Sequence, residues 1–111
     1  MAVSYQVVVT TRAKRDINKI LDYELENNSR KRALEVRREI IDAIHSLAEM
    51  PEARNPVQEV VKLTQDIVFR QVVAKETYRI IYRIREVKKG VVVMRVMHVK
   101  RGPGFVKDAL L

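Results

Sequence analysis

Residues 78–85, Tyr-Arg-Ile-Ile-Tyr-Arg-Ile-Arg, alternate cationic and apolar side chains and are the first candidates for chemistry. Successive side chains of a β-strand point to opposite faces, so Arg79, Arg83 and Arg85 should share one face. Arginine suits phosphate or carboxylate binding, because its planar guanidinium donates paired hydrogen bonds and keeps its charge. We therefore expect a cationic binding surface, the alternative being a solvated sheet face kept soluble by charge.

The preceding run of residues, 67–74, is apolar and β-branched, and Lys75-Glu76-Thr77 resembles a hairpin turn. A turn centred on Lys75 and Glu76 would place Arg70 across from Ile81, on the arginine face. Arg70 would then be the fourth cation of that surface.

A second candidate is the run His98-Val99-Lys100-Arg101, at the end of the last predicted strand. Cleavage of RNA by its own 2′-hydroxyl needs a base, an acid and cations on the developing phosphorane. His98, together with Arg79 and Arg101, could supply part of this set. The alternative is a histidine at a strand end that is hydrogen-bonded to the backbone.

Other chemistries find little support. The chain has no cysteine, and His45 and His98 alone cannot form a structural zinc site, so we expect no metal and no cofactor. His45 should lie on the outer side of a helix. The glutamates at 24, 26, 35 and 39 should be helix charges that pair with Lys19, Arg30, Lys31 and Arg38.

The charge balance is informative: 22 Lys and Arg against 14 Asp and Glu give a net charge of +8 over 111 residues. A field of this sign favours nucleic acid, the ribosome or an acidic protein, although it could serve solubility alone. The N-terminus lacks the pattern of a signal peptide, and no apolar run reaches membrane-spanning length. We expect a soluble, cytoplasmic protein with no membrane partner.

The elements that position these residues can be read from periodicity. Alternation over residues 3–9 predicts a strand, which Val8 interrupts in a way that suggests cover on both faces. Two amphipathic helices follow, the first capped by Thr10 or Thr11, the second capped by Ser29 and ending near Met50-Pro51. Strands at 67–74, 78–85 and 91–99 complete the chain, with a tail at 105–111 and an undecided segment at 51–66, either a short helical turn or an edge segment.

This order predicts a single α+β domain over residues 1–111, with the topology β-α-α-β-β-β. An antiparallel sheet should carry the α-helical hairpin on one face, where the tyrosines and isoleucines of 78–85 meet the apolar helix stripes. The arginine face would then be left uncovered.

The whole pattern resembles the RelE/ParE toxin superfamily, and its helical half resembles the ParE branch. The likeness rests on 78–82, on the valine-rich strand that ends in 98–101, and on apolar residues in both helices, among them Ile17, Ile20 and Ile44. It implies a type II toxin held inactive by a cognate acidic antitoxin. ParE-like members imply DNA gyrase as the target and no nuclease activity, whereas RelE-like members imply cleavage of mRNA on the ribosome.

The RelE-like alternative would use Arg70, Arg79, His98 and Arg101 as its catalytic set. Arg79 and Arg101 match arginines of the RelE pattern, and Arg70 falls where that pattern has a lysine. Val72 and Phe105 depart from it, because a second lysine and a proton-transferring tyrosine are missing. The ParE-like reading, which we favour, has no catalytic residue; antitoxin or target would bind Arg70, Arg79, Arg83, Arg85, Lys100 and Arg101, on the arginine face or in a groove beside the helices. A third reading is an inactive member that only binds nucleic acid or protein.

Overall fold

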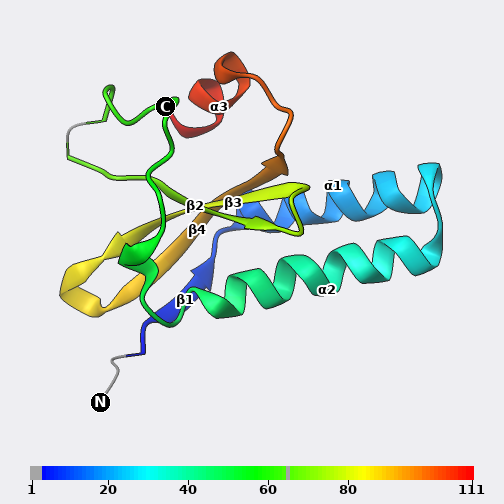
Figure 1. The fold of residues 1–111 in the computed structure, drawn as a ribbon, viewed down its shortest axis with the longest axis horizontal. Coiled ribbons are helices and arrows are strands. Elements are labelled where there is room, and N and C mark those ends of the chain that lie inside the picture. Colours follow the sequence, from blue (N-terminus) through cyan, green and yellow to red (C-terminus); the bar gives the residue numbers. More distant parts are fainter. Residues whose placement is uncertain (1–3, 65) are drawn as a thin grey trace.

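The computed structural model describes residues 4–64 and 66–111 (Figure 1). The chain order is β1 (Gln6–Val9), α1 (Thr11–Asn27), α2 (Arg30–Ser46), β2 (Arg70–Ala74), β3 (Tyr78–Arg85), β4 (Gly90–His98) and α3 (Pro103–Leu110). Short 3-10 turns lie at Pro51–Ala53 and Glu86–Lys88. The strands form one sheet in the order β1-β4-β3-β2. The predicted α+β fold with an α-helical hairpin on the sheet is confirmed.

Strand direction differs from the prediction at one strand. β2, β3 and β4 are antiparallel as expected, but β1 runs parallel to β4, from Gln6 opposite Gly90 to Val9 opposite Val93. The sheet is therefore mixed. Val8 is 52% exposed, so the expected cover on both faces of β1 is wrong, and Val3 lies outside the described residues.

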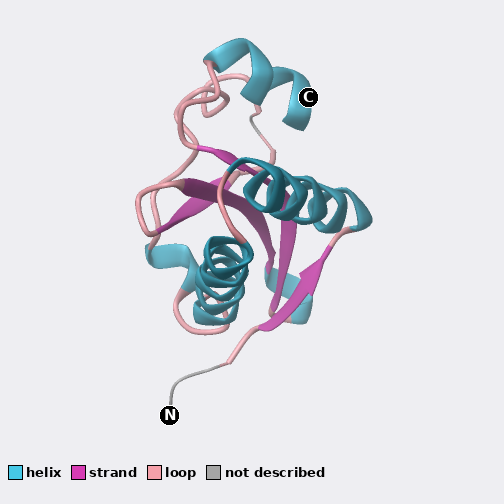
Figure 2. Cartoon of the chain, turned by 90° about the vertical axis from the view of Figure 1, so that its right-hand side faces the viewer, coloured by secondary structure: helices cyan, strands magenta, loops and turns pink. Residues whose placement is uncertain are grey.

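The two helices begin where their caps predict. The Thr10 hydroxyl accepts from the Ala13 N–H at 3.2 Å, and the Ser29 hydroxyl accepts from the Arg32 N–H at 3.0 Å. α2 ends at Ser46, four residues before the predicted end. Figure 2 shows the hairpin against one face of the sheet. The main core lies between them and includes Val36, Ile40, Ile44, Tyr78, Ile80 and Tyr82.

The other face of the sheet is also covered, so the expectation of an open arginine face is wrong. A second cluster packs there, made of Val57, Val60, Phe69, Ile81, Met97 and Val106. Its cover comes from two places that periodicity did not reveal. Residues 51–64 contain turns and form an isolated bridge to β2 between Pro56 and Arg70, residues 66–69 lead into β2, and the expected tail is the helix α3. No helix among the described residues is both long and apolar enough to cross a bilayer.

Candidate binding groove

The arginines of β2 and β3 do not share one face. Arg70 pairs with Tyr82, not Ile81, and Val73 pairs with Arg79. The hairpin loop has three residues, 75–77, closed by a bond from the Thr77 N–H to the Ala74 carbonyl oxygen at 3.0 Å. A loop one residue longer than predicted shifts the register by one, which moves every β2 side chain to the opposite face. Arg70 therefore points to the helix side, where it donates to the Arg54 carbonyl oxygen at 2.7 Å.

Arg79 is buried in an ion pair. Its two terminal nitrogens donate to the Glu59 carboxylate at 2.7 and 2.9 Å, and its Nε donates to Gln71 Oε1 at 3.0 Å. Only 7% of its side chain is exposed. The hydrogen bonds from Arg79 lower the pKa of Glu59. Arg83, half-buried, and Arg85, exposed, lie further along β3.

Several of the sequence candidates line a groove of about 890 Å³ between α1, the distal half of β4 and the start of α3. We call it the α1/β4 groove. It brings together His98, Lys100 and Arg101, as the sequence suggested, and it adds Lys19, Arg95 and three aromatic residues, Tyr23, Tyr78 and Phe105. Arg101 stacks over the Phe105 ring, with its guanidinium carbon 4.4 Å from the ring centre.

Both carboxylates of the α1/β4 groove are already engaged. Asp16 accepts from Arg95 at 2.7 and 3.0 Å and from the Val96 N–H at 3.0 Å. This bond raises the pKa of Arg95. Asp16 lies 79 residues from Arg95, and no local sequence pattern could have paired them.

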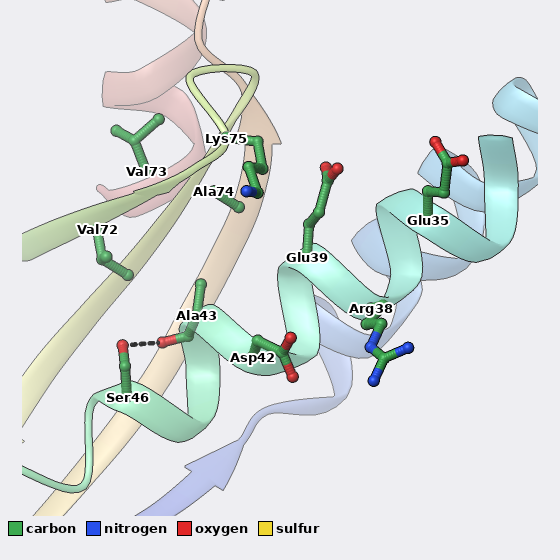
Figure 3. Close-up of a pocket in the computed structure, with 10 residues that line it drawn as sticks. All are labelled: Glu35, Arg38, Glu39, Asp42, Ala43, Ser46, Val72, Val73, Ala74 and Lys75. Atoms are coloured by element: carbon green, nitrogen blue, oxygen red, sulfur yellow. Dashed lines mark hydrogen bonds between the residues drawn. The ribbon is translucent and has the colours of Figure 1, made fainter.

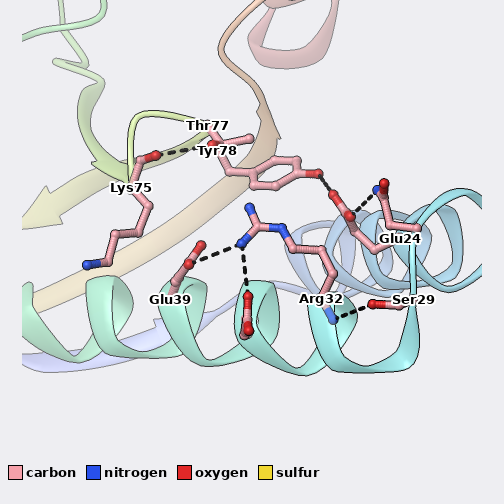
Figure 4. A network of polar contacts seen from close by, with 9 residues as sticks. Glu24, Ser29, Arg32, Glu39, Lys75, Thr77 and Tyr78 are labelled. Carbon is pink, nitrogen blue, oxygen red and sulfur yellow. Dashed lines mark hydrogen bonds and ion pairs between the residues drawn. The ribbon is translucent and has the colours of Figure 1, made fainter.

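Glu24 is a buried acceptor and not the helix charge, paired with a nearby cation, that the helix pattern predicted. It is 5% exposed and accepts from the Tyr78 hydroxyl at 2.8 Å and from the Asn28 amide at 2.6 Å (Figure 4). Burial and the hydrogen bond to Glu24 raise the pKa of Tyr78. Glu35 and Glu39 pair with Arg32, at 3.5 and 3.4 Å, instead of the predicted partners.

His98 is fixed by the backbone. Its Nδ1 accepts from the Lys100 N–H at 3.0 Å, and its ring meets Tyr78 edge-on, with centroids 5.5 Å apart. In the neutral ring that accepts at Nδ1, the proton resides on Nε2, so the free nitrogen is a donor. His45 is exposed on α2, as expected.

The sheet itself separates the four RelE-like candidates. His98 is the cross-strand partner of Tyr78, whereas Arg79 is the partner of Met97, so His98 and Arg79 lie on opposite faces. Arg70 lies on β2, at a register position four residues along β3 from Tyr78, about 13 Å at the rise of a strand. Only His98 and Arg101 share a groove.

A second groove, of about 480 Å³, lies between α2 and β2 (Figure 3). Glu35, Glu39 and Asp42 line its helix side, with Arg38 and Lys75 as its cations. Within residues 4–64 and 66–111, no three acidic or histidine side chains are placed to hold a metal ion.

Comparisons with known proteins agree with this architecture. Residues 7–103 match the model of a family described as ParE toxin of type II toxin–antitoxin system, parDE. No curated protein matches the sequence. The fold is similar to a chromosomal ParDE toxin–antitoxin system from P. aeruginosa, with a TM-score of 0.70, 14% identity, and 89% of this chain and 100% of that chain covered. It is also similar to the RelBE2 toxin–antitoxin complex from Mycobacterium tuberculosis, with a TM-score of 0.53, 24% identity, and 89% and 95% covered.

Proposed function

This chain belongs to the ParE family, the toxins of type II toxin–antitoxin systems, and we propose that it stops growth by binding DNA gyrase without cutting RNA. A cognate acidic antitoxin holds it inactive until the antitoxin is lost. The family supports the toxin role, and the resemblance to the ParE branch supports gyrase as the target.

The observation that carries the choice against a nuclease is the ion pair of Arg79. A RelE-like enzyme would need this guanidinium on the scissile phosphate, but Glu59 already accepts two of its hydrogen bonds and Gln71 a third. Releasing Arg79 would leave a half-buried carboxylate and a buried guanidinium without partners.

The residues of the α1/β4 groove are also poorly suited to general acid–base catalysis of RNA cleavage. His98 uses Nδ1 to accept a backbone N–H and would offer a donor, not a base, to a 2′-hydroxyl. Phe105, the aromatic residue beside Arg101, cannot transfer a proton. What remains is a surface suited to binding.

The test is induced expression in a bacterium that lacks the antitoxin, with DNA damage and translation scored in parallel. Purified toxin is added to a gyrase supercoiling assay, with toxin premixed with antitoxin as the control. Growth arrest with DNA damage, intact translation and loss of supercoiling is expected. Rapid translation arrest with cut mRNA on ribosomes would replace the proposal with the RelE-like endonuclease, and unimpaired growth would replace it with the inactive binding member.

A further inference from the structure

We propose that one corner of the sheet, at the turn between β3 and β4, binds the phosphate backbone of duplex DNA. We call it the β3–β4 corner, and the side chains that carry the argument are Val8, Arg83, Arg85, Val87, Lys88 and Lys89. In Figure 1 the yellow turn lies at the left end of the molecule, opposite the turn between α1 and α2. The proposal goes beyond the binding of gyrase and does not depend on it.

The corner includes a part of the sheet surface that neither apolar cluster covers. Val92 pairs with Arg83 on one side and with Val8 on the other, so these three side chains share a face. It is the face of Ile81, because Ile81 and Arg83 lie two residues apart on β3. The second apolar cluster covers Ile81, but among the described residues Val8 and Val92 belong to neither cluster, and Val8 is 52% exposed. A partner can therefore approach Arg83 and Arg85 across an open surface.

Positive charge dominates the corner. Residues 83–89 contain four cations and one acid, Glu86. Glu86 is engaged by Lys89, at 3.7 Å between two exposed side chains, and such a pair is weak. Within residues 4–64 and 66–111 the other three cations form no ion pair. Free cations of this kind bind DNA because they release the counterions that are condensed on its phosphates.

The apex of the turn is an exposed apolar side chain. Val87 is 99% exposed, so it adds nothing to the core of the monomer. Lys88, the next residue, is also exposed. The major groove of B-form DNA is about 12 Å wide and presents the methyl groups of thymine. Val87 can contact these methyl groups while the cations of the corner hold the phosphates at the edges of the groove.

Other nucleic acids fit the corner less well. Single strands are held by exposed aromatic rings on which their bases stack. The Tyr5 ring beside the turn is half-buried and already carries Lys89, whose Nζ lies 5.6 Å from the ring centre. The exposed rings of Tyr23 and Phe105 line the α1/β4 groove instead. Duplex RNA has a deep, narrow major groove that Val87 could not enter. The corner therefore favours duplex DNA.

The test compares two double charge reversals. Arg85→Glu with Lys88→Glu alters the corner, whereas Lys14→Glu with Arg15→Glu alters α1, and all four side chains are exposed. Both pairs lower the net charge of +8 by the same amount. Purified toxin, free of antitoxin and gyrase, is titrated into a fluorescein-labelled DNA duplex, and anisotropy is recorded between about 50 and 200 mM salt.

We expect the wild type to bind the duplex with an affinity that falls steeply with salt. The corner variant should bind at least about 10-fold more weakly, and the slope of log K against log salt should become shallower by about 2, because two phosphate contacts are lost. The α1 variant should stay within about 3-fold of the wild type, since its charges lie away from the contact and are screened. Equal losses in the two variants would mean that binding follows net charge alone and would overturn the proposal, as would no binding by the wild type at about 50 mM salt.

Two further arms identify the ligand and the part played by the apex. Single-stranded DNA and duplex RNA of the same sequence should bind about 10-fold more weakly than duplex DNA, and equal or tighter binding of either would overturn the assignment to duplex DNA. Val87→Ser should weaken duplex binding by about 3-fold at an unchanged salt slope, because it removes an apolar contact and no charge. Wild-type affinity in Val87→Ser would overturn the contact of the apex with the groove.

Thermal unfolding is recorded for every variant. Arg85→Gln with Lys88→Gln removes the same two positive charges without adding negative ones, so it keeps the comparison valid if the reversals lower stability. We expect this neutral variant to lose the same salt slope. Because the titrations contain no gyrase, a toxin that fails to inhibit gyrase would refute the proposed target and leave the DNA result standing. A neutral variant with the slope of the wild type would contradict the corner as the DNA contact.

Discussion

The Arg79 side chain carries a full charge although only 7% of it is exposed to solvent. Its hydrogen-bond partners therefore determine how much the burial of this charge destabilises the fold. Glu59 and Gln71 together accept from three of its nitrogens. Such a pair is costly to break, because the remaining charge stays buried without compensation. The pair also fastens the turn that contains Glu59 to the sheet.

Glu59→Gln is therefore expected to lower the free energy of unfolding by about 2 to 4 kcal/mol at neutral pH. Urea denaturation measures the change, with Glu52→Gln as the control, because Glu52 is exposed in the same segment. Adding Arg79→Met to Glu59→Gln should restore part of the loss, since no unpaired charge is then buried. Equal stability of Glu59→Gln and wild type would mean that the ion pair does not hold the segment.

At the scale of elements, Asp16 joins α1 to β4. It satisfies the Val96 N–H at the point where β1 stops covering β4, and it neutralises Arg95, which also reaches the Ala109 carbonyl oxygen of α3 at 3.5 Å. One carboxylate thus holds the helix against the strand edge that forms the α1/β4 groove.

We expect Asp16→Ala to lower the free energy of unfolding by about 2 to 3 kcal/mol, because it leaves a buried N–H and a half-buried guanidinium without acceptors. Asp22→Ala is the matched control, since Asp22 is exposed on the same helix. Hydrogen exchange should show faster exchange at the Val96 amide in Asp16→Ala. Unchanged protection there would show that the carboxylate is not needed at this edge.

In the hairpin loop between β2 and β3, two non-glycine residues adopt a strained backbone conformation. Lys75 and Glu76 both have a positive φ, 47° and 63°, a region where a Cβ atom is unfavourable. Glu76→Gly should therefore raise the free energy of unfolding by up to about 1 kcal/mol. Glu76→Ala removes the same carboxylate but keeps the Cβ, so it should give no gain. A gain from both would trace the effect to the carboxylate instead of the backbone.

This loop also marks the limit of what the sequence could predict. The helix caps at Thr10 and Ser29 and the antiparallel run of β2 to β4 followed from local patterns. Turn length did not, because Lys75 and Glu76 carry no glycine or asparagine to indicate left-handed geometry, and one extra residue put Arg70 on the other face. The parallel pairing of β1 and the partners of Arg79 and Arg95 depend on contacts between distant segments.

At the scale of the whole molecule, the sheet is a central layer with apolar clusters on both faces. The α-helical hairpin covers one face (Figure 2), and Val57, Val60 and Phe69 with α3 cover the other. The net charge of +8 is consequently carried by side chains outside the apolar clusters. Lys19, Lys100 and Arg101 of the α1/β4 groove are among these side chains. Two tyrosines and the Glu59 ion pair link the layers and make stability sensitive to pH at both ends of the scale.

The pKa of Glu59 lies below its ordinary value of 4.5 because Arg79 donates to it, so the unfolded chain binds its proton first as the pH falls. Its contribution to stability is complete above about pH 4.5 and is lost as the pH falls toward the folded pKa. Tyr82 behaves in the opposite sense. Burial raises its pKa from 10.0 to about 12, so the folded state keeps a proton that the unfolded chain releases, and stability falls between those values.

Glu59 and Tyr82 should each change the free energy of unfolding by at most about 1.4 kcal/mol per pH unit, between the pKa in the unfolded chain and the pKa in the folded state. Urea denaturation from pH 3 to 7 and from pH 9 to 11.5 measures both limbs. We expect Glu59→Gln to flatten the acid limb alone. Tyr82→Phe should make the alkaline limb shallower without changing the acid limb, and Tyr78, whose pKa is also raised, should account for the slope that is left. It should also cost about 1 kcal/mol at pH 7, because the Pro51 carbonyl oxygen loses its hydroxyl donor at 2.6 Å. An alkaline limb as steep in Tyr82→Phe as in the wild type would assign the decline to other groups, and an acid limb unchanged by Glu59→Gln would remove the ion pair from the acid unfolding of the molecule.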